Sequence, residues 1–310
     1  MNEILAFESN YDSFCDWRSL LAPLVPNLEL MKAADVGEPD RVKYAMVWTP
    51  PAGFFRRFPN LSWIVNLGAG VDGLVARDDL PPIPISRLSD PQMTRMMVSY
   101  VLFAVLRHAR DIPRFERAQR RRHWQAIRPR QNSEIQVGIL GLGELGAAAA
   151  EEIARLGFNT HGWSRSKKCM AGITCHFGDL ALLPFLERTE ILVVVLPLTK
   201  ETRRLLGRAQ LSALPKGAKV VNVSRGAVID EAAFIELLQE GHLMDATLDV
   251  YETEPLPAQS PLWDIENVLI TPHIASVALP ASAARQIADS IGRLRTGLPP
   301  LNLVNPERGY

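Results

Sequence analysis

The feature that most constrains the fold is a glycine-rich turn between an apolar run and a helix-forming segment. Residues 141–146, Gly-Leu-Gly-Glu-Leu-Gly, directly follow the apolar run 136–140 and precede an alanine-rich stretch, 147–155. In such a pattern the first glycine makes a tight turn, the second lets a pyrophosphate approach the backbone, and the third lets the helix pack on the strand. The N–H groups of the first helical turn face the phosphates. The segment therefore predicts a dinucleotide-binding site; an unliganded glycine-rich turn is the alternative.

An acidic residue stands inside this turn. Glu144 would repel a phosphate, so we expect its carboxylate to point to solvent. The residues expected to form the cofactor-binding turn are Gly141, Gly143, Glu144, Leu145 and Gly146.

Apolar runs alternate with helical segments from residue 134 onward. They occupy 136–140, 159–163, 191–196, 219–223, 244–250 and 268–270. Continuous apolar strands are typical of a sheet covered on both faces, so we expect a doubly wound parallel α/β domain with right-handed crossovers.

The first 89 residues show a different pattern, with shorter apolar runs separated by Pro and Gly. These runs, expected to be strands of a smaller α/β unit, lie at 4–7, 28–31, 44–48, 63–67 and 83–85. Apolar residues at helical spacing then predict a long helix over about 90–110. A chain of 310 residues suits two domains.

Composition excludes several classes of protein. The 34 basic residues are balanced by 34 acidic ones, so no overall field would hold the molecule to nucleic acid or an anionic membrane. The longest apolar runs, such as 191–198, are too short to span a bilayer, and the first residues lack the features of a secretion signal. Three cysteines without metal-ligand spacing predict reduced thiols and no metal site. We expect a cytoplasmic protein.

Residues 107–130 are locally basic, with nine arginines and two acids. One interpretation is a nucleic-acid-binding patch. The other is a helix that is solvated or faces another subunit, since Arg114, Arg117 and Arg121 share one helical face. The zero net charge and the lack of a recognition motif favour the second interpretation.

The segment after the second strand of the larger domain predicts which dinucleotide binds. An NAD site has an acid there, about 20 residues after the first glycine, for the ribose 2′-hydroxyl. This chain instead has Ser164, Arg165 and Ser166, followed by Lys167 and Lys168. Cations and hydroxyls suit a 2′-phosphate, so we predict NADP(H) over NAD(H). A basic surface loop without a ligand is the alternative.

Three chemically reactive side chains follow later strands. Arg225 comes after 219–223, Glu254 after 244–250, and His273 after 268–270. Ligands of open α/β sheets bind beyond the carboxyl ends of the strands, so we expect the three groups to converge there. Reduction of a ketone needs a proton donor such as His273, a carboxylate such as Glu254 to orient it, and a cation such as Arg225 to bind a substrate carboxylate. Singly, each could be a salt-bridge arginine, a surface carboxylate or a loop imidazole; their joint placement favours catalysis.

These motifs together resemble the D-2-hydroxyacid dehydrogenase family, and within it the glyoxylate/hydroxypyruvate reductase A type. The similarity covers essentially the whole chain. It rests on the glycine turn and on the segments 67–72, 163–166, 196–199, 222–226, 248–255, 271–273 and 308–310.

The resemblance implies roles for individual residues. Arg225, Glu254 and His273 match the catalytic trio, and Asp249 matches the residue near the nicotinamide amide. Further cofactor contacts are implied for Leu196, Pro197, Thr202, Val223 and Ser224. Gly68, Ala69 and Gly70 match a loop whose N–H groups hold the substrate carboxylate, a nest that uses glycine's access to positive φ. Trp48 is either a pocket wall that keeps the substrate small or a packing residue.

One departure from the family pattern lies in the long helix. Many members have an acid–histidine pair there, whereas this chain has Ser99 and Tyr100. The departure concerns the entrance to the active site and the surroundings of the nicotinamide.

The resemblance also implies an architecture. A Rossmann domain of residues 102–280 is inserted in a flavodoxin-like substrate domain of residues 1–101 and 281–310, with a cleft that closes on substrate. Homodimers are usual, and we expect residues 107–130 to form much of the contact.

The expected function is NADPH-dependent reduction of glyoxylate, hydroxypyruvate or a similar 2-oxo acid to the 2-hydroxy acid. One alternative is a dehydrogenase of a different or larger 2-hydroxy acid; 3-phosphoglycerate would need further cations. The other alternative is a dinucleotide-sensing, corepressor-like scaffold, although such proteins tend to carry long disordered tails.

Overall fold

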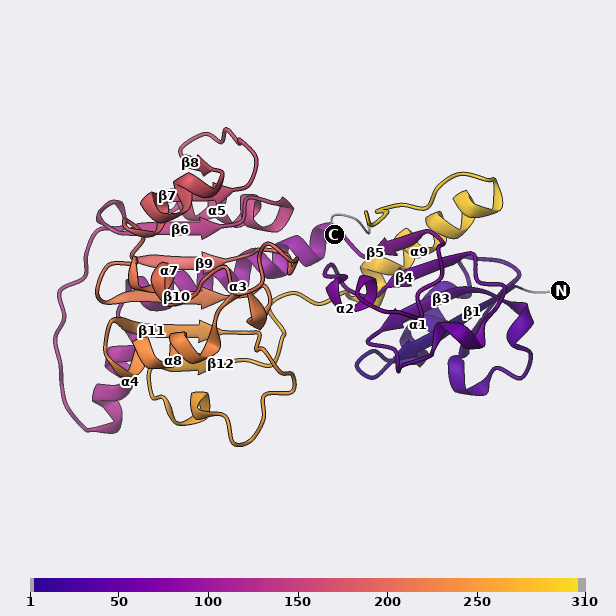
Figure 1. Ribbon diagram of the computed structural model, residues 1–310, viewed down its shortest axis with the longest axis horizontal. Coiled ribbons are helices and arrows are strands. Elements are labelled where there is room, and N and C mark those ends of the chain that lie inside the picture. Colours follow the sequence, from indigo (N-terminus) through magenta and orange to yellow (C-terminus); the bar gives the residue numbers. More distant parts are fainter. Residues whose placement is uncertain (1–2, 306–310) are drawn as a thin grey trace. The chain divides into compact units, whose positions relative to one another are not determined.

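The computed structural model describes residues 3–305, which form two compact units (Figure 1). One unit combines Met1–Met93 with Val277–Tyr310, and the other is the continuous stretch Thr94–Ser276. No helix in the described part of the chain is long and apolar enough to cross a membrane.

The first unit contains a five-stranded parallel sheet. Its strands are β1 (Glu3–Ser9), β2 (Leu28–Lys32), β3 (Val42–Trp48), β4 (Trp63–Asn66) and β5 (Ile85–Arg87), in the spatial order β2-β1-β3-β4-β5. This is the flavodoxin-like order predicted for the smaller domain. The strand expected at 83–85 begins instead at Ile85. Pro84 has no N–H to donate to a ladder, which explains the later start.

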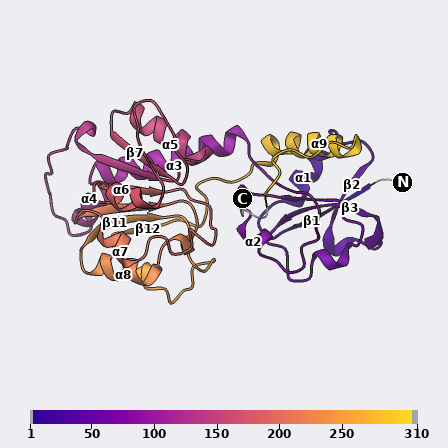
Figure 2. The same cartoon turned by 45° about the horizontal axis from the view of Figure 1, so that its top comes forward.

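Both faces of this sheet are covered. Helix α1 (Phe14–Leu21) and helix α9 (Pro280–Arg295) lie on the same face, as Figure 2 shows. Trp17 of α1 and Ile287 of α9 are fully buried there in one apolar cluster with Leu5 of β1. The opposite face packs against α2 (Asp72–Val75) and three phenylalanines, at positions 54, 55 and 58. The C-terminal helix therefore completes the core of the N-terminal strands.

The second unit contains a seven-stranded, fully parallel sheet. Its strands are β6 (Gln136–Leu140), β7 (Asn159–Ser164), β8 (Thr174–Phe177), β9 (Ile191–Val194), β10 (Ala218–Asn222), β11 (Leu243–Leu248) and β12 (Val268–Ile270). The spatial order is β12-β11-β10-β9-β6-β7-β8, so the strand order reverses between β6 and β9. The predicted doubly wound α/β fold is thereby confirmed. Strand β8 was not predicted, because its residues are only partly buried and carry little apolar pattern.

Helices cover both faces of the second sheet (Figure 2). On one face lie α3 (Pro91–Ala109) and α5 (Glu144–Arg155); on the other lie α6 (Leu182–Leu186), α7 (Arg208–Ser212) and α8 (Glu231–Gln239). Within β9, Ile191 and Val193 pack in the apolar cluster of α3 and α5, whereas Leu192 and Val194 pack in the apolar cluster of α6, α7 and α8. This alternation explains why the strand is apolar at every position.

Short 3-10 turns complete the secondary structure. They lie at Ala33–Asp35, Pro39–Arg41, Phe55–Arg57, Asn132–Glu134, Asp179–Ala181, Gly226–Val228 and Pro261–Asp264. Asp230 caps the N-terminus of α8 by accepting a hydrogen bond from the N–H of Ala233, which satisfies one of the helix's unpaired donors.

The arginine-rich segment folds as the end of α3, the helix α4 (Ile112–Arg120) and an irregular stretch after it (Figure 1). Five of its nine arginines have acidic partners, in the pairs Arg107–Glu116, Arg114–Asp111, Arg117–Asp245, Arg121–Glu266 and Arg130–Glu190. Arg107 is only 8% exposed, so the expectation of a solvated or subunit-facing helix is wrong for this residue. Three acids from outside the segment, Asp245, Glu266 and Glu190, offset part of its positive charge.

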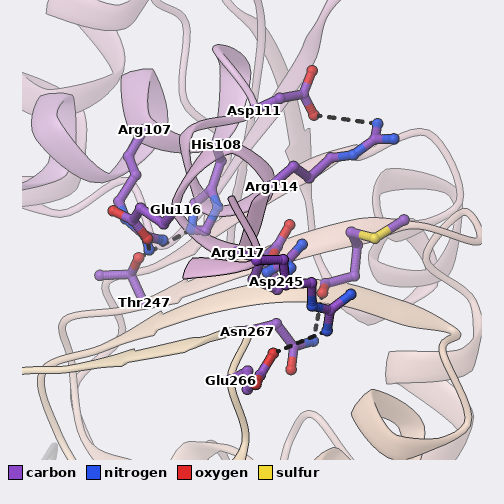
Figure 3. Close-up of polar contacts among 12 residues, drawn as sticks. Arg107, His108, Asp111, Arg114, Glu116, Arg117, Asp245, Thr247, Glu266 and Asn267 are labelled. Atoms are coloured by element: carbon purple, nitrogen blue, oxygen red, sulfur yellow. Dashed lines mark hydrogen bonds and ion pairs between the residues drawn. The ribbon is translucent and has the colours of Figure 1, made fainter. Parts of the chain in front are cut away.

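A neutral histidine lies beside these pairs. His108 is 1% exposed, and its Nε2 atom is 3.0 Å from Thr247 Oγ1 on β11 (Figure 3). Burial, with smaller contributions from the charges of Arg107 and Lys219, lowers the pKa of His108 to about 3. The imidazole is therefore uncharged at neutral pH and joins α3 to the sheet by a neutral hydrogen bond.

Candidate active site

The predicted site residues of the second unit follow strands that end at one edge of the sheet. Leu140 of β6 pairs with Val194 of β9, Val194 with Asn222 of β10, Asn222 with Leu248 of β11, and Leu248 with Ile270 of β12. Because neighbouring strands end in register, the segments that follow them lie side by side.

The glycine turn has room for a dinucleotide. Gly141 has φ +115°, a conformation that L side chains rarely adopt. A Cβ atom at Gly146 would lie 1.9 Å from the carbonyl oxygen of Gly141, so only glycine lets α5 approach the turn this closely. Nothing lies within 4 Å of a Cβ placed at Gly143, which leaves the open space that a pyrophosphate needs. Glu144 is exposed, as expected, and Leu145 is partly buried against the core.

The end of β7 presents the predicted cations to solvent. Ser164 is buried and its hydroxyl donates to the carbonyl of Ser166 at 2.8 Å, whereas Arg165, Lys167 and Lys168 are exposed. Their cationic side chains are therefore in a position to meet a phosphate from outside the sheet.

The loop after β9 is held by its own side chains. Thr202 donates its hydroxyl to the carbonyl of Pro197 at 2.6 Å and accepts the N–H of Thr199 at 2.7 Å. The positive charge of Arg165 is among the causes that lower the pKa of Glu201, after the hydrogen bond from Thr199. Sequence reasoning did not include this acid, although it stands directly after Lys200.

His273 and Glu254 form a hydrogen-bonded pair. The Nδ1 atom of His273 is 2.7 Å from Oε2 of Glu254, and Oε1 of Glu254 accepts the N–H of Tyr251 at 3.0 Å. Burial alone would raise the pKa of Glu254, but the hydrogen bonds from His273 and Tyr251 and the nearby charge of Arg225 together lower it. An ionised carboxylate can only accept, so Nδ1 carries the proton and transfer to a substrate would use Nε2.

The loop that bears His273 is fixed to a buried carboxylate. Asp249 is 1% exposed; its Oδ1 accepts the hydroxyl of Thr271 at 2.6 Å and the N–H of Ile274 at 2.9 Å, and its Oδ2 accepts the N–H of Ala275 at 2.8 Å. His273 itself has φ +57°, a left-handed conformation unusual for a histidine. The surrounding bonds hold this conformation, and strained residues of this kind cluster at functional sites.

Arg225 is positioned by the segment that follows β10. The side-chain amide of Asn222 donates to the carbonyl of Arg225 at 3.2 Å, while its oxygen accepts the N–H and the hydroxyl of Ser224. A Cβ at Gly226 would lie 1.8 Å from the carbonyl carbon of Tyr251. The chain therefore passes directly against the segment after β11, which brings Arg225 near Glu254. Three neighbouring residues predicted to contact the cofactor are buried at these strand ends: Leu196, Val223 and Ser224.

The predicted substrate loop lies in the first unit, after β4. Asn66 donates to the carbonyls of Gly68 and Gly70 at 3.0 and 2.9 Å. A Cβ at Gly68 would lie 2.4 Å from the Trp48 ring, and Gly68 does not have a positive φ. The expectation that Gly68 supplies left-handed backbone is therefore wrong: this glycine is required because Trp48 packs on it.

An arginine near this loop was missed by sequence reasoning. Nη1 of Arg87 is 3.5 Å from the carbonyl oxygen of Ala69, which places a guanidinium beside the expected carboxylate-binding loop. The sequence signal available was weak, a single cation at the end of the short strand β5.

Comparison with known proteins identifies the family of this chain. The sequence profile of the D-isomer specific 2-hydroxyacid dehydrogenase, NAD binding domain, matches residues 102–275. Glyoxylate/hydroxypyruvate reductase A of Yersinia enterocolitica is 35% identical over 302 residues, which covers 95% of this chain and 96% of that protein. The corresponding protein of Serratia proteamaculans is also 35% identical, over 301 residues.

Solved structures give the same result. A D-isomer specific 2-hydroxyacid dehydrogenase from Xanthobacter autotrophicus, in complex with NADPH and MES, is 56% identical with a TM-score of 0.94 and full coverage of both chains. An NADPH-dependent glyoxylate/hydroxypyruvate reductase from Sinorhizobium meliloti, in complex with NADP and sulfate, is 32% identical with a TM-score of 0.92 and the same coverage. The family resemblance predicted from the motifs is confirmed.

The two glycines of the turn predict different defects. In Gly146→Ala the new methyl group meets the Gly141 carbonyl, so we expect the melting temperature of the ligand-free protein to fall by about 5 °C or more. In Gly143→Ala we expect the melting temperature to change by about 1 °C at most and the Kd for NADPH to rise about tenfold or more, because the methyl group occupies the space of the pyrophosphate. Calorimetry and NADPH fluorescence titration measure the two effects. Normal NADPH binding by Gly143→Ala would contradict the assignment of the turn.

Proposed function

Because this chain belongs to the D-isomer specific 2-hydroxyacid dehydrogenase family, we propose that it is an NADPH-dependent reductase of small 2-oxo acids such as glyoxylate and hydroxypyruvate. The observation that carries the proposal is the His273–Glu254 pair, with 2.7 Å between Nδ1 and Oε2, on the sheet edge that also bears the glycine turn. The ligands of two similar structures, NADPH and NADP, support the predicted cofactor.

The residues present fit this cofactor. The turn of Gly141, Gly143 and Gly146 would hold the pyrophosphate, and Arg165 with Ser164 and Ser166 would hold the 2′-phosphate. Bound NADPH supplies the hydride that reduces the carbonyl carbon. The second unit is the proposed dinucleotide-binding domain.

The side chains of the trio perform the remaining chemistry. Arg225 binds the substrate carboxylate and stabilises the negative charge that grows on the carbonyl oxygen. His273 donates a proton from Nε2 to that oxygen, so the carbonyl group of the 2-oxo acid becomes the hydroxyl group of the product and the imidazole is left neutral. Glu254 orients the imidazole and stabilises its positive charge before the transfer.

The first unit is the proposed substrate-binding domain. Backbone N–H groups of Gly68, Ala69 and Gly70 bind the carboxylate, and Arg87 adds positive charge beside them. Trp48 packs on Gly68 and is thus a packing residue. Because its ring lies against the proposed carboxylate-binding loop, it is also the proposed wall that limits the size of the substrate.

Two other functions are distinguished by activity. A dehydrogenase of a larger 2-hydroxy acid would turn over bulky 2-oxo acids faster than glyoxylate. A dinucleotide-sensing scaffold would bind NADPH tightly without turnover.

The cytoplasmic location stays a prediction from the sequence.

The central test is oxidation of NADPH, followed by absorbance, with a panel of 2-oxo acids. We expect turnover of glyoxylate or hydroxypyruvate, a loss of kcat of about 100-fold or more in His273→Ala, and a loss of about tenfold in Glu254→Gln. Glu187→Gln, which makes the same change as Glu254→Gln at an exposed glutamate outside the trio, should keep the wild-type rate. Tight NADPH binding without turnover of any acid would overturn the proposed reaction.

Cofactor preference gives a second test. Arg165→Ala should raise the KM for NADPH about tenfold or more and leave the KM for NADH within about twofold, because only NADPH has the 2′-phosphate. Lys216→Ala removes an exposed cation elsewhere in the second unit and should change neither value. An equal loss with both cofactors would defeat the assignment of Arg165.

We further propose that the protein is a homodimer and that residues 107–130 form much of its interface. A hollow of about 420 Å³ lined by Arg114, Arg117, Arg121, His123 and Gln125 lies in this segment. Trp124 belongs to the same segment and is 96% exposed, which is unusual for a tryptophan and typical of an interface anchor.

Light scattering at micromolar concentration tests the assembly. We expect twice the chain mass for the wild type and a shift to monomer for Trp124→Glu, because a charge would replace the tryptophan that the proposed interface covers. Leu180→Glu changes another exposed apolar residue, 97% exposed, outside the segment and should stay dimeric. A monomeric wild type would reject the homodimer.

A further inference from the structure

A chain of hydroxyl groups connects helix α3 to the loop that bears His273. The hydroxyl of Tyr100 is 2.5 Å from Oγ1 of Thr271, and Thr271 donates its hydroxyl to Oδ1 of Asp249 at 2.6 Å. A threonine hydroxyl has one hydrogen, which Asp249 receives, so Tyr100 is the donor to Thr271.

Tyr100 keeps its proton. Burial and the negative charge of Asp249 raise the pKa of this phenol to about 12, although the hydrogen bond with Thr271 acts in the opposite direction. The phenol is therefore protonated at neutral pH and can donate its hydrogen to Thr271.

Tyr100 lies on a part of helix α3 that is firmly packed against the sheet. Its neighbours on α3, Val101 and Ala104, are fully buried in the core beneath the sheet. The ring of Phe103 packs edge-on at 6.2 Å between centroids. Tyr100 thus transmits the fixed position of α3 to Thr271.

The bonds of Asp249 flank His273 on both sides. Thr271 precedes the histidine, Ile274 and Ala275 follow it, and the backbone N–H of His273 donates to the carbonyl of Asp249 at 2.8 Å. The left-handed backbone conformation of His273 is unfavourable by itself, so it needs these hydrogen bonds on both sides to be maintained. Removal of the Tyr100 bond would leave Thr271 tied to Asp249 but not to α3.

We propose that Tyr100 is a positioning residue that holds His273 in its proton-donating geometry through Thr271 and Asp249. The inference rests on the proposed function, in which His273 is the acid. It concerns the helix position where the chain departs from the common family pattern: Ser99 is exposed and its hydroxyl donates to the carbonyl of Met96 on the same helix, whereas the hydroxyl of Tyr100 bonds Thr271 in the loop that bears His273.

Steady-state kinetics separate positioning from binding. Tyr100→Phe should lower kcat about tenfold and leave the KM for the 2-oxo acid and the Kd for NADPH within about twofold. Thr271→Val should show the same split and Thr271→Ser should restore kcat, because serine keeps the hydroxyl. The double variant Tyr100→Phe/Thr271→Val should be no slower than the worse single variant, since both interrupt one chain of bonds.

Tyr44→Phe is the matched control. Tyr44 also loses a side-chain hydrogen bond, 3.1 Å to Glu3, but it lies in the first unit. We expect its kcat to equal that of the wild type. Full kcat in Tyr100→Phe, or a loss that appears only in KM or Kd, overturns the proposal.

A measurement that does not require catalysis tests the positioning role of Tyr100 independently of the proposed reaction. In NMR spectra of histidine-labelled protein, the imidazole signals of His273, identified with His273→Gln, should shift in Tyr100→Phe and stay unchanged in Tyr44→Phe. Unchanged signals in Tyr100→Phe refute the positioning role whether or not the wild type reduces an acid. A wild type without turnover whose His273 signals do shift overturns the proposed function alone.

Discussion

The carboxylate of Asp249 is buried at the end of β11 and accepts three hydrogen bonds from the segment 271–275. A buried carboxylate without partners is costly, and these bonds satisfy it while they fix the loop. The position of His273, its left-handed backbone and its approach to Glu254 all depend on this arrangement. Asp249 is therefore a structural centre of the candidate site as well as a residue expected near the cofactor.

The parallel sheet explains how distant parts of the chain reach one site. Its strands end in register, so each loop after a strand needs only a few residues to place its side chain beside the next. Close backbone packing does the rest. Gly146 lets α5 approach the phosphate-binding turn, and Gly226 lets the segment of Arg225 lie against that of Glu254.

Much of this arrangement could be predicted from the sequence, because the glycine turn and the residues after apolar strands are local signals with a fixed structural meaning. Pairings between distant residues could not. Tyr100 and Thr271 are 171 positions apart, and Arg117 and Asp245 are 128 apart, so no local pattern connects them. The need for glycine at position 68 likewise comes from a tertiary contact with the Trp48 ring, and the motif had suggested a backbone angle instead.

The division of the first unit between the two ends of the chain has a consequence for biosynthesis. Ile287 and Ala283 of α9 belong to the same core as Trp17 and Leu5, yet the ribosome makes residues 94–276 in between. At about 5 to 20 residues per second this takes on the order of ten seconds or more. Until α9 is made, the face of the N-terminal sheet that α1 covers lacks its second helix, whereas the inserted unit has its whole sequence as soon as residue 276 is made. The order of folding is thus set by the order of synthesis: the inserted domain can mature first, and the domain that begins the chain is the last to close.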